Sequence, residues 1–271
     1  MGKIGIFIPC YNVQNSVKEV LRSFSPEVLE KIETIVAVDN CSSDDTFLSL
    51  KEMQDPHTEI GKRLVVIKNS DNYGLGGSQK IAYQYFLDQK FTHFMIIHGD
   101  NQGNGDMIAK EFLKSFDQNK DLDVIYASRF IQGSDVSGYN RLRIWGNLFF
   151  NFVTFLLTGC RMSDAGAGII MYKTKILREL PFHHLTNSSQ FNPQLNILIH
   201  GMKGIKITEV PLHWHDSSDQ TNISAHRYCI NLLKILLRYR WNKTFLRRAG
   251  WKLFYSQSQQ LTPTVDIVFP S

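Results

Sequence analysis

The sequence contains little cysteine, with four residues in a chain of 271. Cys10, Cys41, Cys160 and Cys229 form no Cys-x-x-Cys pair and no spacing typical of metal ligands. A zinc site and a disulfide framework are therefore both unexpected, because each needs grouped or regularly spaced thiols. We expect free thiols in a reducing compartment.

The sequence also lacks a run of about 20 apolar residues, the length that a membrane-spanning helix requires. Its apolar segment 144–158 is interrupted by Asn147 and Asn151 and is predicted to form a buried or interfacial helix. The first residues enter a strand pattern without the basic region, long apolar stretch and cleavage site of a signal peptide. These features predict a cytoplasmic protein.

Charge is modest overall, with a net value of +5, but the positive residues are concentrated late in the chain. This asymmetry predicts an anionic surface as partner. Segment 227–241 reads as an amphipathic helix that either lies on that surface or caps the core. Its apolar stripe is Ile230, Leu233, Leu237 and Trp241, and its solvated basic residues are Lys234, Arg238 and Arg240. The late basic residues continue beyond this segment with Lys243, Arg247, Arg248 and Lys252.

Short apolar runs alternate with helical spacings through the first 130 residues. This alternation, without hairpin signals, predicts an α/β fold with a parallel sheet covered by helices on both faces. The predicted strands are residues 3–9, 34–38, 64–67, a run ending at His98, and 124–127. The predicted helices are 17–24, a segment from Ser43 or Asp44 to about 53, one beginning beyond Gly77, and 106–117.

The pattern changes after Arg129. A helix at 144–158 is followed by a strand at 169–172, a helix at 190–200, a strand at 204–214 and the amphipathic helix at 227–241. The tail from about 253 to 271 is polar and is predicted to be partly disordered.

One strand ends abruptly in acceptor groups, where the apolar run Phe94 to Ile97 meets His98-Gly99-Asp100-Asn101-Gln102. In open α/β sheets ligands bind beyond the carboxyl ends of the strands, so a carboxylate and an amide here are placed to meet a cation or a nucleotide. A strand-to-helix turn with Asp100 and Asn101 as cap residues is the alternative.

The glycine cluster after Asn72 matches neither common phosphate-binding fingerprint. Gly74 and Gly76 are not followed by a glycine at position 79, and no Gly-Lys-Ser/Thr sequence closes the loop. A dinucleotide-dependent dehydrogenase and a Walker-type ATPase are therefore disfavoured, and a simple turn is the alternative use of these glycines.

Six motifs, taken in order, make the chain resemble the family 2 glycosyltransferases of GT-A fold, and among them the dolichyl- or polyprenyl-phosphate mannosyltransferase-like branch. The resemblance implies a mostly parallel central sheet flanked by helices. It implies one domain over residues 1–241, with a nucleotide-sugar-binding half (1–130) and an acceptor half (131–241), followed by a basic and polar tail (242–271). The motifs are Ile8-Pro9-Cys10-Tyr11-Asn12, Val38 to Thr46, Asn72 to Gly77, His98 to Gln102, Ser128-Arg129 and Ser163 to Gly168.

The resemblance also implies a donor site for a UDP- or GDP-sugar. Asp39 would accept a hydrogen bond from the nucleobase, and Asn40 stands where the family often has a second acid. The glycines would let the backbone approach the nucleotide closely. The donor-binding residues implied are Pro9, Tyr11, Asn12, Asp39, Asn72, Gly74, Gly76, Asp100 and Gln102.

By the same resemblance, Asp100 and Gln102 would hold Mg²⁺ or Mn²⁺ against the diphosphate. The first acid of the family's Asp-x-Asp motif is His98 here, which favours manganese over magnesium if the imidazole is a ligand, because magnesium prefers oxygen. His98 is alternatively a group behind the ligands. His213 and His215 are further candidate ligands, although a strand places residues i and i+2 on one side in any case.

On the acceptor side the resemblance assigns Arg129, with Arg141 or Arg143, to a lipid phosphate, which the guanidinium binds well. With a sugar hydroxyl as acceptor, Asp164 is the candidate general base; its alternative is a turn residue. We therefore expect an inverting glycosyltransferase acting on a polyprenyl phosphate or a membrane-linked glycan, peripherally at the cytoplasmic face of an anionic membrane. We expect no nucleic-acid partner. The alternatives are a hydroxyl-acceptor transferase of surface-polysaccharide assembly, a sugar nucleotidyltransferase, and a nucleotide-sugar-binding or adaptor protein without activity.

Overall fold

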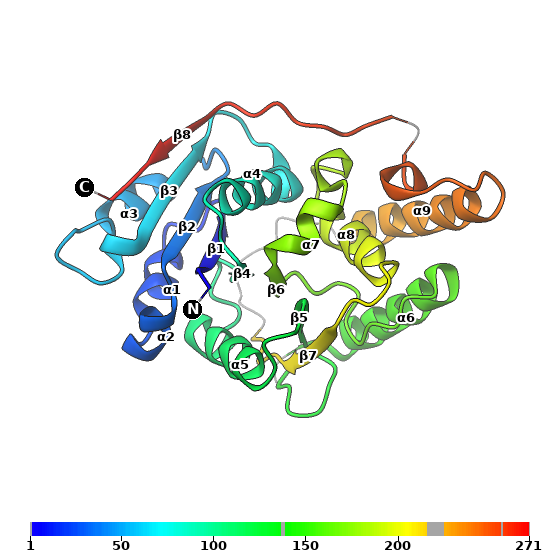
Figure 1. Cartoon of the computed structure of the whole chain (residues 1–271), viewed down its shortest axis with the longest axis horizontal. Helices are drawn as coiled ribbons and strands as arrows, with labels where there is room; N and C mark the ends of the chain where they lie inside the picture. Colours follow the sequence, from blue (N-terminus) through cyan, green and yellow to red (C-terminus); the bar gives the residue numbers. More distant parts are fainter. Residues whose placement is uncertain (1, 137–138, 216–224, 256, 271) are drawn as a thin grey trace.

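A computed structural model describes residues 2–136, 139–215, 225–255 and 257–270 of the protein. Its centre is an eight-stranded sheet in the order β7-β5-β6-β4-β1-β2-β3-β8 (Figure 1). β6 and β8 run antiparallel to their neighbours, and the other neighbouring strands are parallel. The predicted α/β class with a mostly parallel sheet is confirmed. The strands are β1 (Ile4–Cys10), β2 (Thr34–Asp39), β3 (Leu64–Asn69), β4 (His93–Ile96), β5 (Val124–Ser128), β6 (Ile170–Lys173), β7 (Ile207–Pro211) and β8 (Val265–Val268).

Side chains of the strands alternate between two hydrophobic cores, one on each face of the sheet. On β1, Ile6 and Ile8 contribute to one core and Phe7 to the other. The first core is covered by α1 (Val17–Ser23), α2 (Pro26–Lys31), α3 (Thr46–Glu52) and α5 (Gly105–Gln118). The second is covered by α4 (Gly74–Asp88), α7 (Thr174–Glu179), α8 (Phe191–His200) and α9 (Ala225–Thr244), with α6 (Arg141–Thr158) packed at its margin. Short 3-10 turns occur at Gly61–Arg63, Phe182–His184 and Gly250–Leu253.

The parallel strands deliver polar residues to one edge of the sheet. β2 ends at Asp39 and β5 at Ser128, and the chain after β4 continues into His98 and Asp100. Because carboxyl ends of parallel strands meet at a common edge, residues far apart in the sequence are brought together there.

Two predicted helix starts were wrong. α4 begins at Gly74 and not beyond Gly77, because Gly76 and Gly77 sit within the helix, where they pack tightly against other segments. The N-cap of α3 is Asp45 and not Ser43 or Asp44, although an oxygen of Asp44 accepts a hydrogen bond from the Thr46 backbone at 3.0 Å.

Part of the tail belongs to the sheet, contrary to the expected partial disorder. β8 pairs antiparallel with β3, in a register that places Val268 opposite Val66. Side chains hold the tail as well, because the amide of Gln54 donates to the Val268 carbonyl at 3.0 Å. The division of the chain into a domain over 1–241 and a tail over 242–271 stays a prediction.

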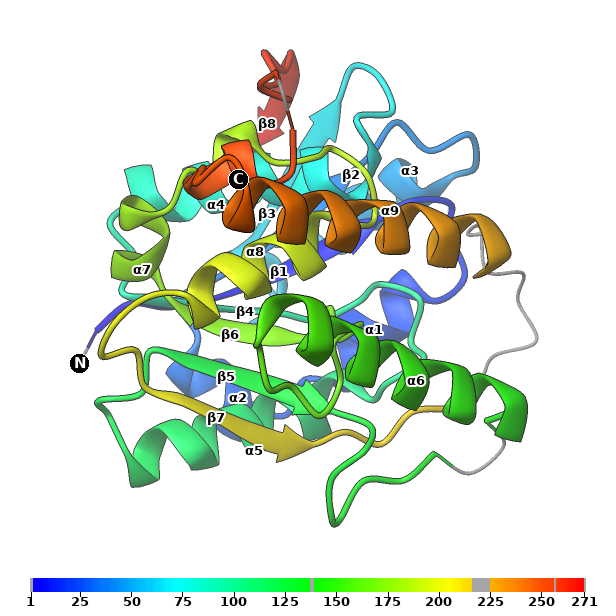
Figure 2. The same ribbon diagram turned by 90° about the vertical axis from the view of Figure 1, so that its right-hand side faces the viewer.

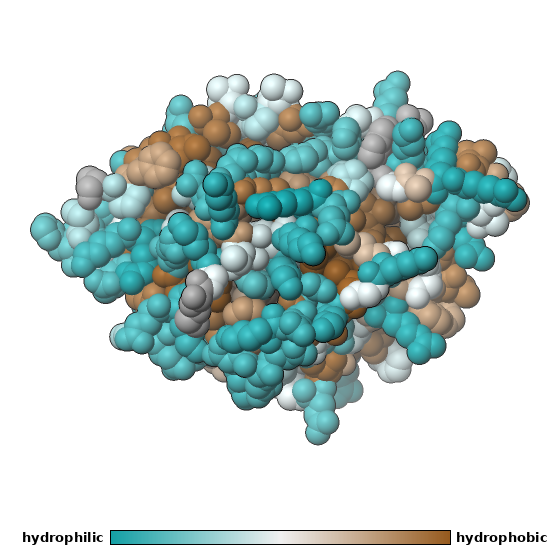
Figure 3. Space-filling view, in the orientation of Figure 1, coloured by the Kyte–Doolittle hydropathy of each residue, from teal (hydrophilic) through white to brown (hydrophobic). Residues whose placement is uncertain are grey.

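The outer faces of α6 and α9 carry exposed apolar side chains, which we call the apolar surface. It consists of Trp145, Phe149, Phe152 and Leu156 on α6 with Ile230, Leu233, Leu237 and Trp241 on α9. The two helices lie side by side (Figure 2), and Figure 3 shows hydrophobic residues at the rim of the molecule where they lie.

The apolar surface corrects two expectations from the sequence. Residues 144–158 do not form a buried helix, since Trp145 is 72% exposed and Phe149 62% exposed. The helix at 227–241 does cover the core, but through Leu232, Leu236 and Tyr239 and not through the predicted apolar stripe, which is exposed. Within the described parts of the chain, no helix is long and apolar enough to cross a membrane.

Candidate active site

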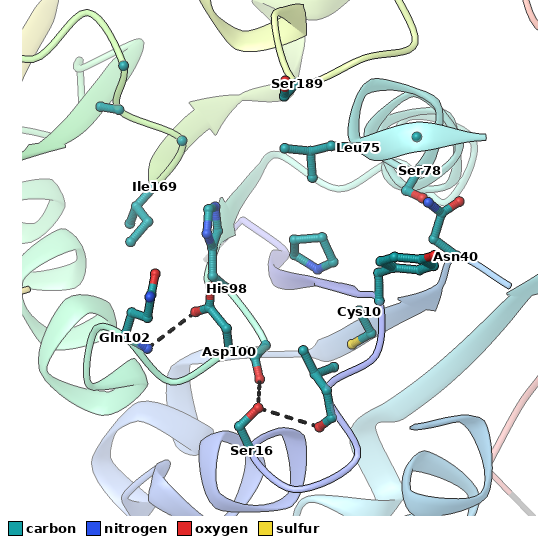
Figure 4. Close-up of a pocket in the computed structure, with 18 of the residues that line it drawn as sticks. Cys10, Ser16, Asn40, Leu75, Ser78, His98, Asp100, Gln102, Ile169 and Ser189 are labelled. Atoms are coloured by element: carbon teal, nitrogen blue, oxygen red, sulfur yellow. Dashed lines mark hydrogen bonds between the residues drawn. The ribbon is translucent and has the colours of Figure 1, made fainter. Parts of the chain in front are cut away.

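A cavity of about 560 Å³ opens at the edge where the strands β1 and β5 and the loop after β4 end. Figure 4 shows residues around it, with His98 and Gln102 on one side and Asn40 on the other. Of the predicted site residues, Asp39, Gly76 and Arg141 do not line the cavity. Those that do are Pro9, Tyr11, Asn12, Asn72, Gly74, His98, Asp100, Gln102, Arg129 and Asp164.

Asn40 organises the glycine-containing wall of this cavity. Its Oδ1 accepts hydrogen bonds from the Asn69 side chain at 2.9 Å and the Tyr73 backbone at 3.0 Å, and its Nδ2 donates to Asn72 Oδ1 at 2.8 Å. Asn72 Oδ1 also accepts from the Gly74 backbone at 2.9 Å. An aspartate at position 40 could accept but not donate, so the departure from the family's acid suits this network.

Asp39 lies behind the wall and is 1% exposed. One carboxylate oxygen accepts a hydrogen bond from the Ser42 backbone at 3.2 Å, and the other has no partner among the described residues. A buried acceptor without a partner is costly, so this oxygen is suited to receive an N–H group from a ligand.

Gly76 acts through packing instead of through contact with the cavity. A Cβ at this position would lie 2.6 Å from the Thr186 carbonyl oxygen and 2.7 Å from the Phe191 Cβ. Glycine is therefore required for α4 to approach the segment before α8.

The loop after β4 presents the candidate metal ligands. Asp100 Oδ1 accepts a hydrogen bond from the Gln102 backbone at 3.2 Å, and Ser16 Oγ donates to the Gly99 carbonyl at 2.8 Å. No group of three His, Cys, Asp or Glu side chains able to hold a metal occurs in the described part of the chain, including around His213 and His215. One carboxylate and one amide oxygen fit an ion that takes its remaining ligands from substrate phosphates and water, as Mg²⁺ commonly does.

The Nε2 atom of His98 is buried and has no hydrogen-bond partner among the residues the structure describes. This edge of the imidazole lies against Gly168, where an added Cβ would be 3.1 Å from His98 Nε2 and 3.2 Å from Asn192 Nδ2. Nε2 is therefore buried against Gly168 and is not exposed, which favours His98 as a group behind the ligands.

Arg129 and Asp164 form a buried bidentate ion pair. Arg129 Nε donates to Asp164 Oδ2 at 2.7 Å and Nη2 donates to Oδ1 at 2.8 Å, with the side chains 13% and 1% exposed. Burial alone would lower the pKa of the Arg129 guanidinium, but the hydrogen bonds and charge of Asp164 raise this pKa above its ordinary value. The pair keeps a positive guanidinium at the cavity wall.

Aromatic rings enclose the guanidinium. Its central carbon lies 5.3 Å from the Phe130 ring centroid, 5.7 Å from that of Tyr139 and 5.9 Å from that of Trp214. Arg129 Nη1 also donates to the Tyr139 hydroxyl at 3.1 Å. These contacts leave one N–H on each terminal nitrogen for a ligand, since a guanidinium has five N–H donors.

Asp164 is poorly placed to act as a general base, because both of its carboxylate oxygens accept hydrogen bonds from Arg129. The geometry instead favours Asp164 as the residue that orients the guanidinium. Its role as a base, and the roles of the other site residues, stay predictions.

Sequence reasoning missed three residues of the site. In the resemblance Asn40 stands out only as a departure from the family's acid, and Trp214 lies between two histidines whose side chains carry the more obvious ligand chemistry. Tyr139 carries no motif, so no signal in the sequence links it to Arg129.

Comparison with known proteins matches residues 5–181 to the model of "Glycosyl transferase family 2". The chain is 25% identical over 189 residues to a UDP-N-acetylglucosamine–dolichyl-phosphate N-acetylglucosaminyltransferase of Methanococcus voltae, which covers 65% of this chain and 72% of the relative. It is 26% identical over 221 residues to an undecaprenyl-phosphate 4-deoxy-4-formamido-L-arabinose transferase of Enterobacter sp. (strain 638), covering 78% of this chain but only 59% of that relative.

Solved structures with the same fold include glucosyl-3-phosphoglycerate synthase of Mycobacterium tuberculosis in complex with UDP. The TM-score is 0.62 at 13% identity, and the match covers 89% of this chain and 80% of that one. The complex of that enzyme with Mn²⁺, UDP and phosphoglyceric acid matches with a TM-score of 0.59 at 14% identity, covering 89% and 78%. At these identities the likeness concerns the fold.

Proposed function

Because the chain belongs to glycosyl transferase family 2, and so is a glycosyltransferase, we propose that it transfers a sugar from a nucleotide diphosphate donor to a polyprenyl phosphate, with inversion at the anomeric carbon. Relatives named as transferases to dolichyl and undecaprenyl phosphate support this acceptor class.

The observation that carries the proposal is that one cavity is lined by Asp100 and by the enclosed guanidinium of Arg129. An anionic donor and an anionic acceptor would meet in it. The helix α6, which begins shortly after Tyr139, presents the apolar surface on its outside, where a lipid chain would lie.

On the donor side, we assign Pro9, Tyr11, Asn12 and Asn72 to contacts with the nucleoside. The unpartnered oxygen of Asp39 would accept the N–H of the base, which uracil and guanine both offer. Gly74 would let the cavity wall approach the nucleotide closely, and Gly76 would support that wall through its packing against Thr186 and Phe191. UDP in the structural neighbours and in the name of one relative supports a UDP-sugar over a GDP-sugar.

Asp100 and Gln102 would hold Mg²⁺ or Mn²⁺, with His98 behind them. When bound there, such a cation would supply positive charge that stabilises a departing nucleoside diphosphate. Structural neighbours solved with Mn²⁺ support a divalent ion in this fold.

On the acceptor side, a lipid phosphate needs no general base, because it is an anion at neutral pH. Arg129 would bind and orient this phosphate with its two remaining N–H donors. An oxygen of the lipid phosphate would attack the anomeric carbon of the sugar, while the bond between that carbon and the nucleoside diphosphate breaks. Arg141, exposed at the start of α6 and outside the cavity, is the proposed first contact for the incoming phosphate.

The apolar surface and the basic residues of α9 would hold the enzyme peripherally at the cytoplasmic face of an anionic membrane. Arg227, Lys234, Arg238 and Arg240 are exposed on the same helix as Leu237 and Trp241. Each basic residue near an anionic surface contributes about 1 kcal/mol of attraction.

The test is transfer of labelled sugar from UDP- and GDP-sugars to polyprenyl phosphate in detergent with Mn²⁺, using Arg129→Ala and Asp164→Asn. We expect Arg129→Ala to lose transfer while donor hydrolysis persists. Arg178→Ala, which removes an exposed arginine of α7, is the matched control and should behave as wild type. Full activity of Arg129→Ala, together with loss of activity in Asp164→Asn, would instead support a hydroxyl acceptor.

A further inference from the structure

The inner face of α6 carries two asparagines, Asn147 and Asn151, one helical turn apart. Residues four apart share a helix face, so both amides point the same way. The apolar surface occupies the outer face of this helix, so α6 separates the exposed apolar residues from the polar site.

Asn151 holds the chain on both sides of Asp164. Its Oδ1 accepts a hydrogen bond from the Ala165 backbone at 2.9 Å, and its Nδ2 donates to the Ser163 carbonyl. Only a side chain that accepts and donates at the same time satisfies both groups, which aspartate and leucine cannot do.

Residues of β5 and β7 also bind the turn that contains Ser163 and Asp164, so Asn151 adds to contacts that already hold Ser163 in place. The Ser163 backbone donates to Glu209 Oε1 of β7 at 3.0 Å, and the Ser163 hydroxyl lies 2.5 Å from that of Ser128 at the end of β5. With the turn fixed at Ser163, the contacts of Asn151 determine where the Asp164 carboxylate points.

Asn147 acts on the other partner of the ion pair. Its Nδ2 donates to the Tyr139 hydroxyl at 3.3 Å, and this hydroxyl also accepts from Arg129 Nη1 at 3.1 Å. One face of α6 therefore reaches Asp164 directly at its turn and Arg129 through Tyr139.

We propose that Asn151 is a positioning residue, which sets the direction of the Asp164 carboxylate and, through it, the place of the Arg129 guanidinium in the cavity. Asn147 supports the guanidinium from its other end. As far as it concerns acceptor binding, this inference rests on the proposed function. A displacement of about 1 Å at a reacting or binding group can reduce the rate by about 100-fold, so a residue without substrate contact can control turnover.

The test uses Asn151→Leu and Asn151→Asp in the full chain. Thr154→Val is the matched control, because Thr154 is buried on the same helix and its hydroxyl has no partner among the described residues. Three quantities are measured: the NMR resonance of the Arg129 side-chain Nε–H, the donor dissociation constant, and kcat/KM for polyprenyl phosphate. The resonance is assigned by its loss in Arg129→Lys.

We expect both Asn151 variants to shift or broaden the Arg129 resonance and to lower kcat/KM for the acceptor by about 10- to 100-fold. The donor dissociation constant should stay within about twofold of the wild-type value, because Asn151 does not act on the donor side; a loss of about 1.4 kcal/mol in binding would raise it roughly tenfold. Thr154→Val should match wild type in all three. Unchanged resonance and unchanged kcat/KM in both Asn151 variants would overturn the inference.

Failure of the proposed function is recognised separately. If wild-type protein transfers no sugar to polyprenyl phosphate while Asn151→Leu still shifts the Arg129 resonance, the acceptor assignment fails and the positioning of the ion pair stands. The NMR measurement needs no substrate, so it decides the structural part alone. If Asn151→Leu does not fold, Asn151→Asp carries the test, because it keeps the side-chain volume and the acceptor for Ala165.

Discussion

The Arg129–Asp164 pair gives a stability prediction that can be worked from its geometry. Arg129→Met roughly keeps the length of the side chain and removes its charge. The Asp164 carboxylate, whose side chain is only 1% exposed, then loses its ion-pair partner. Among the described residues, the hydrogen bond to this carboxylate that remains is the long one from the Arg129 backbone, at 3.3 Å. Removing one partner of a buried ion pair costs about 3–5 kcal/mol, because the remaining charge stays buried without compensation.

Asp164→Asn should cost less than Arg129→Met. The guanidinium keeps its hydrogen bond to Tyr139, its contacts with three aromatic rings and some access to water, since its side chain is 13% exposed. Cation–π contacts contribute up to about 2 kcal/mol when desolvated, so they offset part of the loss. The double variant Arg129→Met/Asp164→Asn should be more stable than the sum of the single losses predicts.

The assay is urea denaturation of the four proteins at one pH, with thermal unfolding as a second measurement. In a chain of 271 residues, with an unfolding entropy of about 2.1 cal/mol/K per residue, about 3–5 kcal/mol corresponds to a fall in Tm of roughly 5–9 °C. The coupling energy from the double-mutant cycle reports the pair itself. Additive losses, or single variants within about 0.5 kcal/mol of wild type, which is the range of ordinary surface substitutions, would refute the reasoning.

Three further predictions concern other parts of the fold. Gly76→Ala should lower the free energy of unfolding by about 1–3 kcal/mol, because the added Cβ overpacks the site. Gly146→Ala should raise it by about 0.5–1 kcal/mol, because a Cβ there meets nothing within 4 Å. Equal effects of the two variants in urea denaturation would contradict this. Burial lowers the pKa of His93 from 6.5 to about 4, so the unfolded chain binds this proton at a higher pH than the folded chain does. The free energy of unfolding should therefore fall by about 3 kcal/mol in all as the pH decreases from 6.5 to about 4. His93→Leu should flatten that pH dependence, and an unaltered profile would exclude His93 as its source. Asn40→Asp should weaken UDP binding, measured by calorimetry, by about tenfold. A carboxylate oxygen would replace the amide nitrogen that donates to Asn72 Oδ1, and the lost hydrogen bond costs about 1–2 kcal/mol. Unchanged affinity for UDP would contradict the role of Asn40 in organising the cavity wall.

The sheet was predictable from the sequence because each strand is a short apolar run that ends in polar residues. The runs at 34–38 and 64–67 correspond to β2 and β3, with bounds that differ by one or two residues. The insertion of β6 between β4 and β5 was not predictable, since strand order depends on long-range packing and leaves no local pattern.

The start of α4 was missed because glycine usually breaks helices. Here Gly76 and Gly77 lie inside the helix, and both positions are too crowded for a side chain. A Cβ at Gly76 would meet the Thr186 carbonyl, and one at Gly77 would meet the Tyr73 Cβ. The strand β8 was missed because it is only four residues long, Val265–Val268, at the end of a tail that is polar as a whole, and its pairing partner, β3, lies about 200 positions earlier.

At the candidate site, motifs gave the residues but not their partners. Arg129 and Asp164 were both expected at the site, one as a phosphate ligand and the other as a possible base. Their mutual hydrogen bonds, which reassign Asp164, depend on the approach of two loops 35 residues apart. The outward direction of the apolar stripe on α9 likewise depends on which face packs against the sheet, and amphipathicity alone leaves that choice open.

The most direct test of the central claim is to incubate the protein with a labelled UDP-sugar, Mn²⁺ and a polyprenyl phosphate, and to separate lipid-extractable product from free sugar. We predict a sugar–phosphate–lipid product formed in equal amount with released nucleoside diphosphate, and abolished in Arg129→Ala. Release of free sugar without any lipid product, or transfer to a glycan hydroxyl alone across all donors, would contradict the assignment.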